Sequence, residues 1–327
     1  WWVKERELGN PTVEIDWNIL DYSKEIPSAY GGNPNPWGEL RAKAATNRED
    51  RKRQGILQNV PGYSMRDLAV AEAAEKVWHQ LRFTVPPRKD QVTTPAAGGF
   101  ATQGLGVNTP EYYGVPRWEG TPEENLKMLR AAAHIFGSPQ AYVTEVDDHT
   151  RKLFYNIVRW EDIDKPYQDG KVWVIPNKCK WQISLVMKQN DIIGRSMTKV
   201  ADSGPIQGYP SRFQETETYL AYDSLQVLML KLQYFLIALG YLGIDENNEM
   251  SLTVPWSILN GLGEPCRATI ACSPDYGLAI RRPVCMFTDL PLAPTPPIDA
   301  GIFRFCRDCG ICANNCPSGG LSKEKEP

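Results

Sequence analysis

Four cysteines stand close together toward the C-terminal end of the chain, and they constrain its folding more than any other feature. The run is Cys306-x2-Cys309-x2-Cys312-x3-Cys316, followed at once by Pro317. Gaps of two residues let a tight loop point successive thiolates at neighbouring corners of one iron–sulfur cluster, while a fourth cysteine before proline reaches toward a second cluster. A zinc site more usually pairs two Cys-x2-Cys elements across a longer loop. The spacing therefore predicts an iron–sulfur segment rather than a zinc knuckle.

This run has the spacing found in bacterial ferredoxins, where it serves two clusters. Two four-iron clusters need eight thiolates, and the run supplies four. The remaining cysteines are Cys179, Cys266, Cys272 and Cys285. They have no close mutual spacing and stand in apolar or strand-like surroundings, where buried free thiols are common. We therefore expect the first three cysteines of the run to hold one cluster, the fourth to belong to a second, and the other ligands to lie beyond Pro327.

Composition places the rest of the chain among ordinary globular proteins. Its 327 residues are 42% hydrophobic and 23% charged, with a formal net charge of -3. That length suggests about two structural units. The near-neutral balance supplies no basic field, so nucleic acid is not expected as a partner.

The first 120 residues are expected to form an irregular segment that wraps the remainder of the chain. Residues 31–38 read Gly-Gly-Asn-Pro-Asn-Pro-Trp-Gly, which is typical of a loop, and residues 86–120 are again rich in Gly and Pro. A helix is expected over residues 64–81, with Ser64 as its N-cap. The glycines near residue 104 lack the preceding strand and following helix that a nucleotide-binding loop needs, so no nucleotide site is expected.

Residues 121–300 show the pattern of a mixed α+β domain. Thr121, Pro122 and Glu124 form a capping box that predicts the start of a helix, and Gly137 predicts its end. Four strand-like runs follow and are expected to form one sheet: residues 141–146, 153–158, 172–175 and 183–187.

A long buried helix is expected over residues 217–239. Its apolar positions are too numerous for a solvated surface. The most apolar stretch has about the length of a membrane span, but Gln226, Lys231 and Gln233 favour a buried helix instead. Four prolines between residues 291 and 297 then predict a stiff connector into the cysteine run.

Three short runs precede the cysteines: Gly-Leu-Gly-Glu at 261–264, Pro-Asp-Tyr-Gly at 274–277, and Phe-Thr-Asp-Leu-Pro-Leu-Ala-Pro at 287–294. With the cysteines, they resemble the catalytic subunit of reductive dehalogenases. The resemblance extends from about residue 120 to the end, is most specific from Tyr219 onward, and is closest to enzymes of anaerobic bacteria that respire chlorinated ethenes. The first 120 residues add little to it.

The resemblance implies a fold in which residues 121–300 form a nitroreductase-like corrinoid-binding core. Residues 1–120 would be the irregular N-terminal part of that domain, and residues 301–327 would begin a ferredoxin-like two-cluster domain. It further implies removal of halogen from chlorinated compounds, chloroethenes in particular, at a corrinoid cobalt that two 4Fe-4S clusters reduce.

Partners and location are also implied by the resemblance. The partners are a chlorinated small-molecule substrate, a small membrane-anchor subunit and an electron donor chain. Family members are normally exported folded by a twin-arginine signal to the outer face of the cytoplasmic membrane. The chain shows no such signal, since Arg281-Arg282 is internal.

No histidine is expected to bind cobalt. Asp147-Asp148-His149 begins the Asp-x-His-x-x-Gly loop of other corrinoid proteins, but Lys152 stands where the glycine is needed. His149 is therefore interpreted as a residue of a surface turn.

For proton transfer, the resemblance implies a tyrosine, a nearby cation and an asparagine. A phenol of pKa about 10 is a poor acid at neutral pH, and an adjacent cation favours its phenolate. The matching segments place the tyrosine at Tyr222 and the asparagine at Asn248. Arg281 fits the cation best, with Arg282 as the alternative and Arg267 third.

Two other functions stay open at this point. An epoxyqueuosine reductase would share the corrinoid and the clusters but act on tRNA, against which the net charge of -3 argues. A simple iron–sulfur electron-transfer protein would use its large domain only structurally, and corrinoid in the extracted protein would exclude it.

Overall fold

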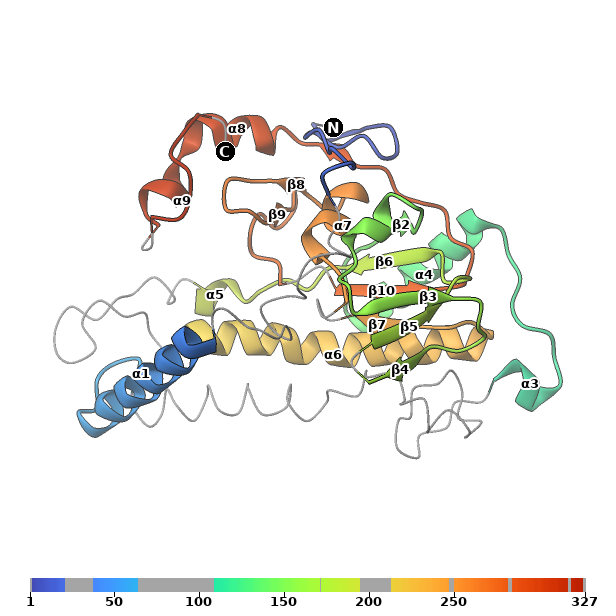
Figure 1. Cartoon of the computed structure of the whole chain (residues 1–327), viewed down its shortest axis with the longest axis horizontal. Coiled ribbons are helices and arrows are strands. Elements are labelled where there is room, and N and C mark those ends of the chain that lie inside the picture. The colour runs from blue at the N-terminus through green and yellow to red at the C-terminus, as the bar shows by residue number, and fades with distance from the viewer. Residues whose placement is uncertain are drawn as a thin grey trace. The chain divides into compact units, whose positions relative to one another are not determined.

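The computed structural model describes residues 2–20, 38–63, 109–170, 172–194, 213–246, 250–281, 284–316 and 319–325 (Figure 1). The chain divides into two compact units. The first contains Trp1–Ile26, Phe83–Met187 and Leu228–Pro327, and the second contains Pro27–Arg82 and Lys188–Val227. Helices and strands both contribute to the first unit, which confirms the predicted mixed α+β class.

A four-stranded antiparallel sheet forms the centre of the first unit. Its strands, in order, are β2 (Ala141–Glu145), β6 (Trp181–Leu185), β10 (Val284–Thr288) and β7 (Ile244–Glu246). The two central strands, β6 and β10, pair along five residues each. Paired residues of these two strands are about 100 positions apart in the sequence, so the pairing joins two distant parts of the chain.

The expected single sheet is wrong. A separate three-stranded sheet contains β3 (Val158–Glu161), β5 (Val172–Pro176) and β4 (Tyr167–Asp169), with β3 and β5 parallel. The strand expected from residue 153 begins only at Val158, because the short 3-10 helix η4 (Thr150–Leu153) comes first and Phe154 makes only an isolated bridge to Ser251. Alternation of apolar and polar residues predicts where a strand lies, but it does not predict which strand pairs with it.

Two two-stranded ribbons and a set of short helices complete the first unit. β1 (Lys4–Glu5) pairs with β11 (Ile298–Asp299), and β8 (Glu264–Pro265) pairs with β9 (Ala271–Cys272). Its helices are α3 (Pro110–Tyr113), α4 (Pro122–Phe136), α7 (Thr253–Leu259), α8 (Ile302–Cys309) and α9 (Ile311–Asn314). α7 packs between the ribbon β8–β9 and the central sheet.

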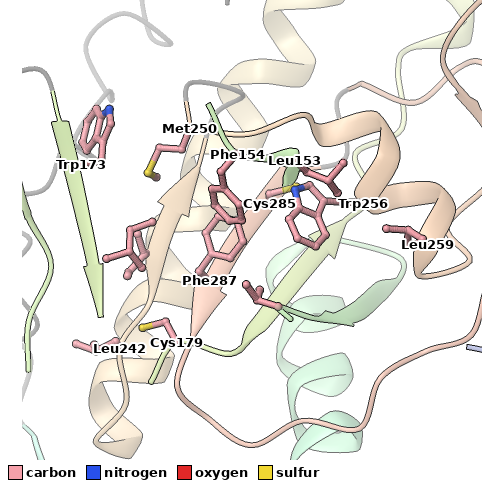
Figure 2. Close-up of a cluster of buried hydrophobic side chains, with 13 residues drawn as sticks. Leu153, Phe154, Trp173, Cys179, Leu242, Met250, Trp256, Leu259, Cys285 and Phe287 are labelled. Atoms are coloured by element: carbon pink, nitrogen blue, oxygen red, sulfur yellow. The ribbon is translucent and has the colours of Figure 1, made fainter. Parts of the chain in front are cut away.

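Figure 2 shows the principal core, where aromatic rings from three separate segments meet. The Phe154 ring lies 5.7 Å from that of Trp256 and 5.0 Å from that of Phe287. Trp256 is fully buried, and its indole N–H donates to Ser251 Oγ at 2.9 Å. Cys179 and Cys285 are buried in the same cluster and form no disulfide, so these two are core thiols as expected.

The capping box at the start of α4 is confirmed. Thr121 Oγ1 accepts from the Glu124 N–H at 3.2 Å, and the Glu124 carboxylate accepts from the Thr121 N–H at 2.9 Å. Gly137 ends the helix with φ of 111°, a conformation that side chains with a Cβ rarely adopt.

The long helix is confirmed as α6 (Phe213–Leu239). Two of its polar residues have partners: the Gln233 amide donates to the Gly243 carbonyl at 2.9 Å, and Lys231 Nζ lies 5.9 Å from the centre of the Phe136 ring. In the described part of the chain, no helix has both the length and the apolar character needed to cross a membrane.

The expectation of an irregular N-terminal segment is wrong for α1 (Gly38–Leu57), a helix of the second unit. This stretch is rich in Ala, Arg, Lys and Glu, which are good helix formers, although Gly and Pro dominate the residues before it. The second unit also contains α5 (Asp191–Gly194). The helix expected over residues 64–81 lies outside the described residues.

Helix α4 offers a matched pair of positions for testing the core. Leu129 is fully buried at 0% exposure, whereas Ile135 on the same helix is 78% exposed. We predict that Leu129→Ala lowers the free energy of unfolding by about 2–5 kcal/mol, because a cavity remains in the core. Ile135→Ala should change it by less than about 0.5 kcal/mol. Urea unfolding measures both, and equal losses would contradict the described packing.

A buried carboxyl group ends strand β7. Glu246 is 1% exposed, and its Oε1 accepts from the N–H groups of Met250 at 3.0 Å and Ser251 at 3.2 Å. Burial raises the pKa of Glu246 from 4.5 to about 7, although these hydrogen bonds oppose the shift. Between those pH values the folded state holds a proton that the unfolded state has lost, so stability falls as the pH rises from about 4.5 to 7.

We therefore predict that Glu246→Gln stabilises the protein at pH 8, by on the order of 1–3 kcal/mol, and much less at pH 5. The amide oxygen can still accept from Met250 and Ser251, while the ionisation penalty disappears. Urea unfolding at the two pH values measures the difference. Glu145→Gln, at an exposed position of the same sheet, is the control and should show no such pH dependence. A loss of stability at pH 8 in Glu246→Gln is the opposite result.

Candidate functional site

The cysteine run folds as two short helices joined by a glycine. Cys306 and Cys309 are three residues apart on α8, so their side chains share one helix face. Gly310, with φ of 60°, ends α8 and caps α9, which carries Cys312. Cys316 follows α9, and its N–H donates to the Ala313 carbonyl at 3.3 Å. All four are half-buried, and none forms a disulfide.

The carboxylate of Glu264, in the ribbon β8–β9, binds the start of the cysteine segment. Glu264 is 1% exposed, and its Oε2 accepts from the N–H groups of Ala300 at 2.7 Å and Ile302 at 2.9 Å. These are backbone donors just before and at the first residue of α8. A carboxylate at this position also favours the helix electrostatically.

The guanidinium of Arg267, in the same ribbon, binds the cysteine segment at later residues. Arg267 is 5% exposed and donates to the Cys306 carbonyl from both Nε at 3.1 Å and Nη2 at 2.9 Å. Its Nη1 donates to the carbonyls of Ser322 and Glu324, each at 2.7 Å. The guanidinium thus joins the ribbon to both sides of the cysteine run.

Two upstream cysteines also lie beside the segment. Burial, with smaller contributions from the nearby Cys266 and Cys306, raises the pKa of Cys272 to about 11. Burial likewise raises the pKa of Cys266, with smaller contributions from Cys306 and Cys312. The expectation that Cys266 and Cys272 are buried thiols is wrong: both are half-buried and lie near Cys306.

The donor set fits an iron–sulfur cluster. Half-buried cysteine thiols on and just after a pair of helices joined by a glycine are the donors that such a cluster takes. Among the residues that the structure describes, no group of three His, Cys, Asp or Glu side chains is arranged to hold a single metal ion. The assignment of Cys306, Cys309, Cys312 and Cys316 as ligands stays a prediction.

Tyr222 is a buried residue of α6, with 6% exposure. Its ring centre lies 6.4 Å from that of Tyr219, one helical turn earlier, at a tilt of 53°. Both tyrosines belong to the second unit. The role of Tyr222 as proton donor stays a prediction.

The three candidate cations have different outcomes. Arg281 is half-buried, and its backbone N–H donates to the Met187 carbonyl at 2.9 Å, just before β10. Arg267 is committed to main-chain carbonyls of the cysteine segment, as described above. Arg282 lies outside the described residues, as does Asn248.

Sequence reasoning missed what Glu264 and Arg267 do. Glu264 appeared only within a matching run, and Arg267 only as a third choice of cation. Their partners are backbone groups, which every residue carries. No pattern of side chains in the sequence could therefore predict these hydrogen bonds. His149, interpreted as a surface-turn residue, is exposed in a turn with its ring centre 5.6 Å from that of Trp17.

Comparisons with known proteins agree over the whole chain. The family described as reductive dehalogenase subunit matches residues 1–162, which includes the N-terminal part that added little to the earlier resemblance. The chloroethene reductive dehalogenase of Dehalococcoides mccartyi (strain VS) is 26% identical over 399 residues, covering 100% of this chain and 71% of the relative.

A second relative is the trichloroethene reductive dehalogenase of Dehalococcoides mccartyi (strain ATCC BAA-2266 / KCTC 15142 / 195). It is 31% identical over 252 residues, covering 67% of this chain and 44% of the relative. The solved structure of the catabolic reductive dehalogenase NpRdhA, N-terminally tagged, has a similar fold, with a TM-score of 0.50 and 15% identity. The match covers 77% of this chain and 31% of that one.

The chain thus spans less than half of the second relative and of this solved structure, while spanning most of the first. The curated relatives favour a dehalogenase over the epoxyqueuosine reductase alternative. The chain belongs to the reductive dehalogenase family.

Proposed function

We propose that the protein replaces halogen by hydrogen in chlorinated organic compounds, with chloroethenes as the substrate class. Two relatives are named for chloroethene and trichloroethene. The observation that carries the proposal furthest is the attachment of a half-buried tetracysteine segment to the α+β core through Glu264 and Arg267. Such an attachment suits a domain that receives electrons from clusters.

The cofactors proposed are a corrinoid and two 4Fe-4S clusters. Cys306, Cys309 and Cys312 would hold one cluster and Cys316 would belong to the other. The α+β unit would correspond to a nitroreductase-like corrinoid domain, and the segment from residue 301 to the start of a ferredoxin-like one. When bound, the corrinoid would supply a strongly reducing cobalt centre for carbon–halogen cleavage.

The residues proposed for the proton are Tyr222, Asn248 and a cation at Arg281 or Arg282. Overall, two electrons and one proton convert the carbon–halogen bond into a carbon–hydrogen bond and release halide. Tyr222 would give its phenolic proton to the carbon, and the guanidinium would stabilise the phenolate that remains. Asn248 would be the asparagine that the family resemblance implies beside them.

The partners proposed are a small membrane-anchor subunit and an electron donor chain, at the outer face of the cytoplasmic membrane after twin-arginine export. Family membership supports this placement. Protease treatment of intact cells tests it: the protein should be digested without lysis, and full protection until lysis would contradict the placement.

Chloride release tests the proposed activity. Protein reconstituted anaerobically with hydroxocobalamin, iron and sulfide, and given a low-potential reductant, should release chloride from trichloroethene and form a less chlorinated ethene. Omission of the corrinoid should abolish both products. A protein that carries cobalt and iron but releases halide from no organohalide would contradict the proposal.

Tyr222 offers a specific test of the proton donor. We predict that Tyr222→Phe lowers kcat by at least about 100-fold, the usual contribution of a positioned general acid, with cobalt and iron contents unchanged. Tyr219→Phe, one turn away on the same helix, is the matched control and should keep most of the activity. Equal activity in wild type and Tyr222→Phe would remove Tyr222 from the mechanism without affecting the proposed reaction.

A further inference from the structure

Arg267 is a buried cation. The partners of its guanidinium among the described residues are the dipoles of main-chain carbonyls. Every hydrogen bond of its guanidinium goes to a main-chain carbonyl: Cys306, Ser322 and Glu324 at 2.7–3.1 Å, and Arg307 and Lys325 at 3.4 Å. Among the described residues it makes no ion pair with a carboxylate. A charge at 5% exposure is weakly screened by solvent, so its field acts on whatever lies beside it.

The thiols of the proposed cluster lie beside this cation. The guanidinium contacts the backbone of Cys306 itself, and Cys306 and Cys312 lie within electrostatic range of Cys266, the residue before Arg267. A cluster ligated by thiolates is anionic and becomes more so when it is reduced. A nearby buried positive charge therefore stabilises the reduced state more than the oxidised state.

We propose that Arg267 sets the reduction potential of the cluster held by Cys306, Cys309 and Cys312, and fixes the position of that cluster against the core. It is a positioning residue that acts through the Cys306 backbone and through its charge, in place of the acid–base role considered for it from the sequence. This inference rests on the proposed cofactors and adds to them a residue outside the ligand set.

Other arginines of the segment differ from Arg267 in exposure. The Arg304 side chain is 65% exposed and pairs with Asp299 at 2.8 Å. Arg307 is also exposed, with its guanidinium 5.7 Å from the centre of the Phe303 ring. Their charges are screened by solvent, so they should affect a buried cluster far less. Arg304 therefore provides a matched control two residues from Cys306.

The experiment is a redox titration of the cluster-loaded protein, followed by electron paramagnetic resonance. Arg267→Gln should shift the midpoint potential to a more negative value, with at least a tenfold change in the reduction equilibrium, which is 59 mV for one electron. Arg267→Lys keeps the charge and should stay closer to wild type than Arg267→Gln. Arg304→Gln should leave the potential unchanged.

Trypsin cleavage of the cluster-free chain tests the positioning and needs no cofactor. Loss of the Arg267 contacts should let trypsin cut after Arg304 and Arg307 at least tenfold faster in Arg267→Gln, with the circular dichroism spectrum unchanged. This measurement also decides the case if Arg267→Gln cannot hold a cluster. An unchanged cleavage rate overturns the proposed positioning.

The outcomes separate this inference from the proposed function. A wild-type protein that carries the ligands expected beyond Pro327 and still binds no iron–sulfur cluster overturns the proposed cofactor. A loaded wild type whose midpoint potential is the same in Arg267→Gln overturns the inference about Arg267 alone, as does an equal shift in Arg304→Gln.

Discussion

One short ribbon, β8–β9, holds the chemically distinctive part of this chain. Its buried carboxylate, Glu264, binds the backbone where α8 begins, and its buried guanidinium, Arg267, binds the backbone at Cys306 and after the cysteine run. Burying two charged groups is costly unless each is hydrogen-bonded. Here backbone N–H groups bind Oε2 of Glu264, and backbone carbonyls bind the Arg267 guanidinium, so the ribbon and the segment depend on each other.

Buried hydrogen bonds also tie the connector that precedes the cysteine segment to the core. The Thr295 hydroxyl donates to the Asn260 carbonyl at 2.7 Å and accepts from the Val143 N–H at 3.0 Å. The Asn125 amide donates to the Pro291 carbonyl at 2.9 Å. The proline-rich connector predicted from the sequence is thus tied along α4, β2 and α7, which fixes the direction in which the cysteine segment leaves the core.

Sequence reasoning succeeded where the signal is local and failed where it depends on distant partners. The capping box at Thr121 and the apolar run that forms α6 are patterns of neighbouring residues, and both were predicted. The pairing of β6 with β10 joins residues about 100 positions apart. β6 was predicted as a strand but β10 and β7 were not, and β3 and β5 were wrongly expected in one sheet with β2 and β6. Arg267 could not be assigned because its acceptors are carbonyls, and Asn248 and Arg282 lie outside the described residues.

Hydrogen exchange in the cluster-free chain tests the dependence of the cysteine segment on the ribbon most directly. Mass spectrometry of exchange at increasing urea concentrations compares peptides from residues 262–274 with peptides from residues 300–309. The structure predicts that both lose protection at the same urea concentration, because Glu264 and Arg267 join them into one unit. Full exchange of residues 300–309 at urea concentrations where residues 262–274 stay protected would contradict that dependence.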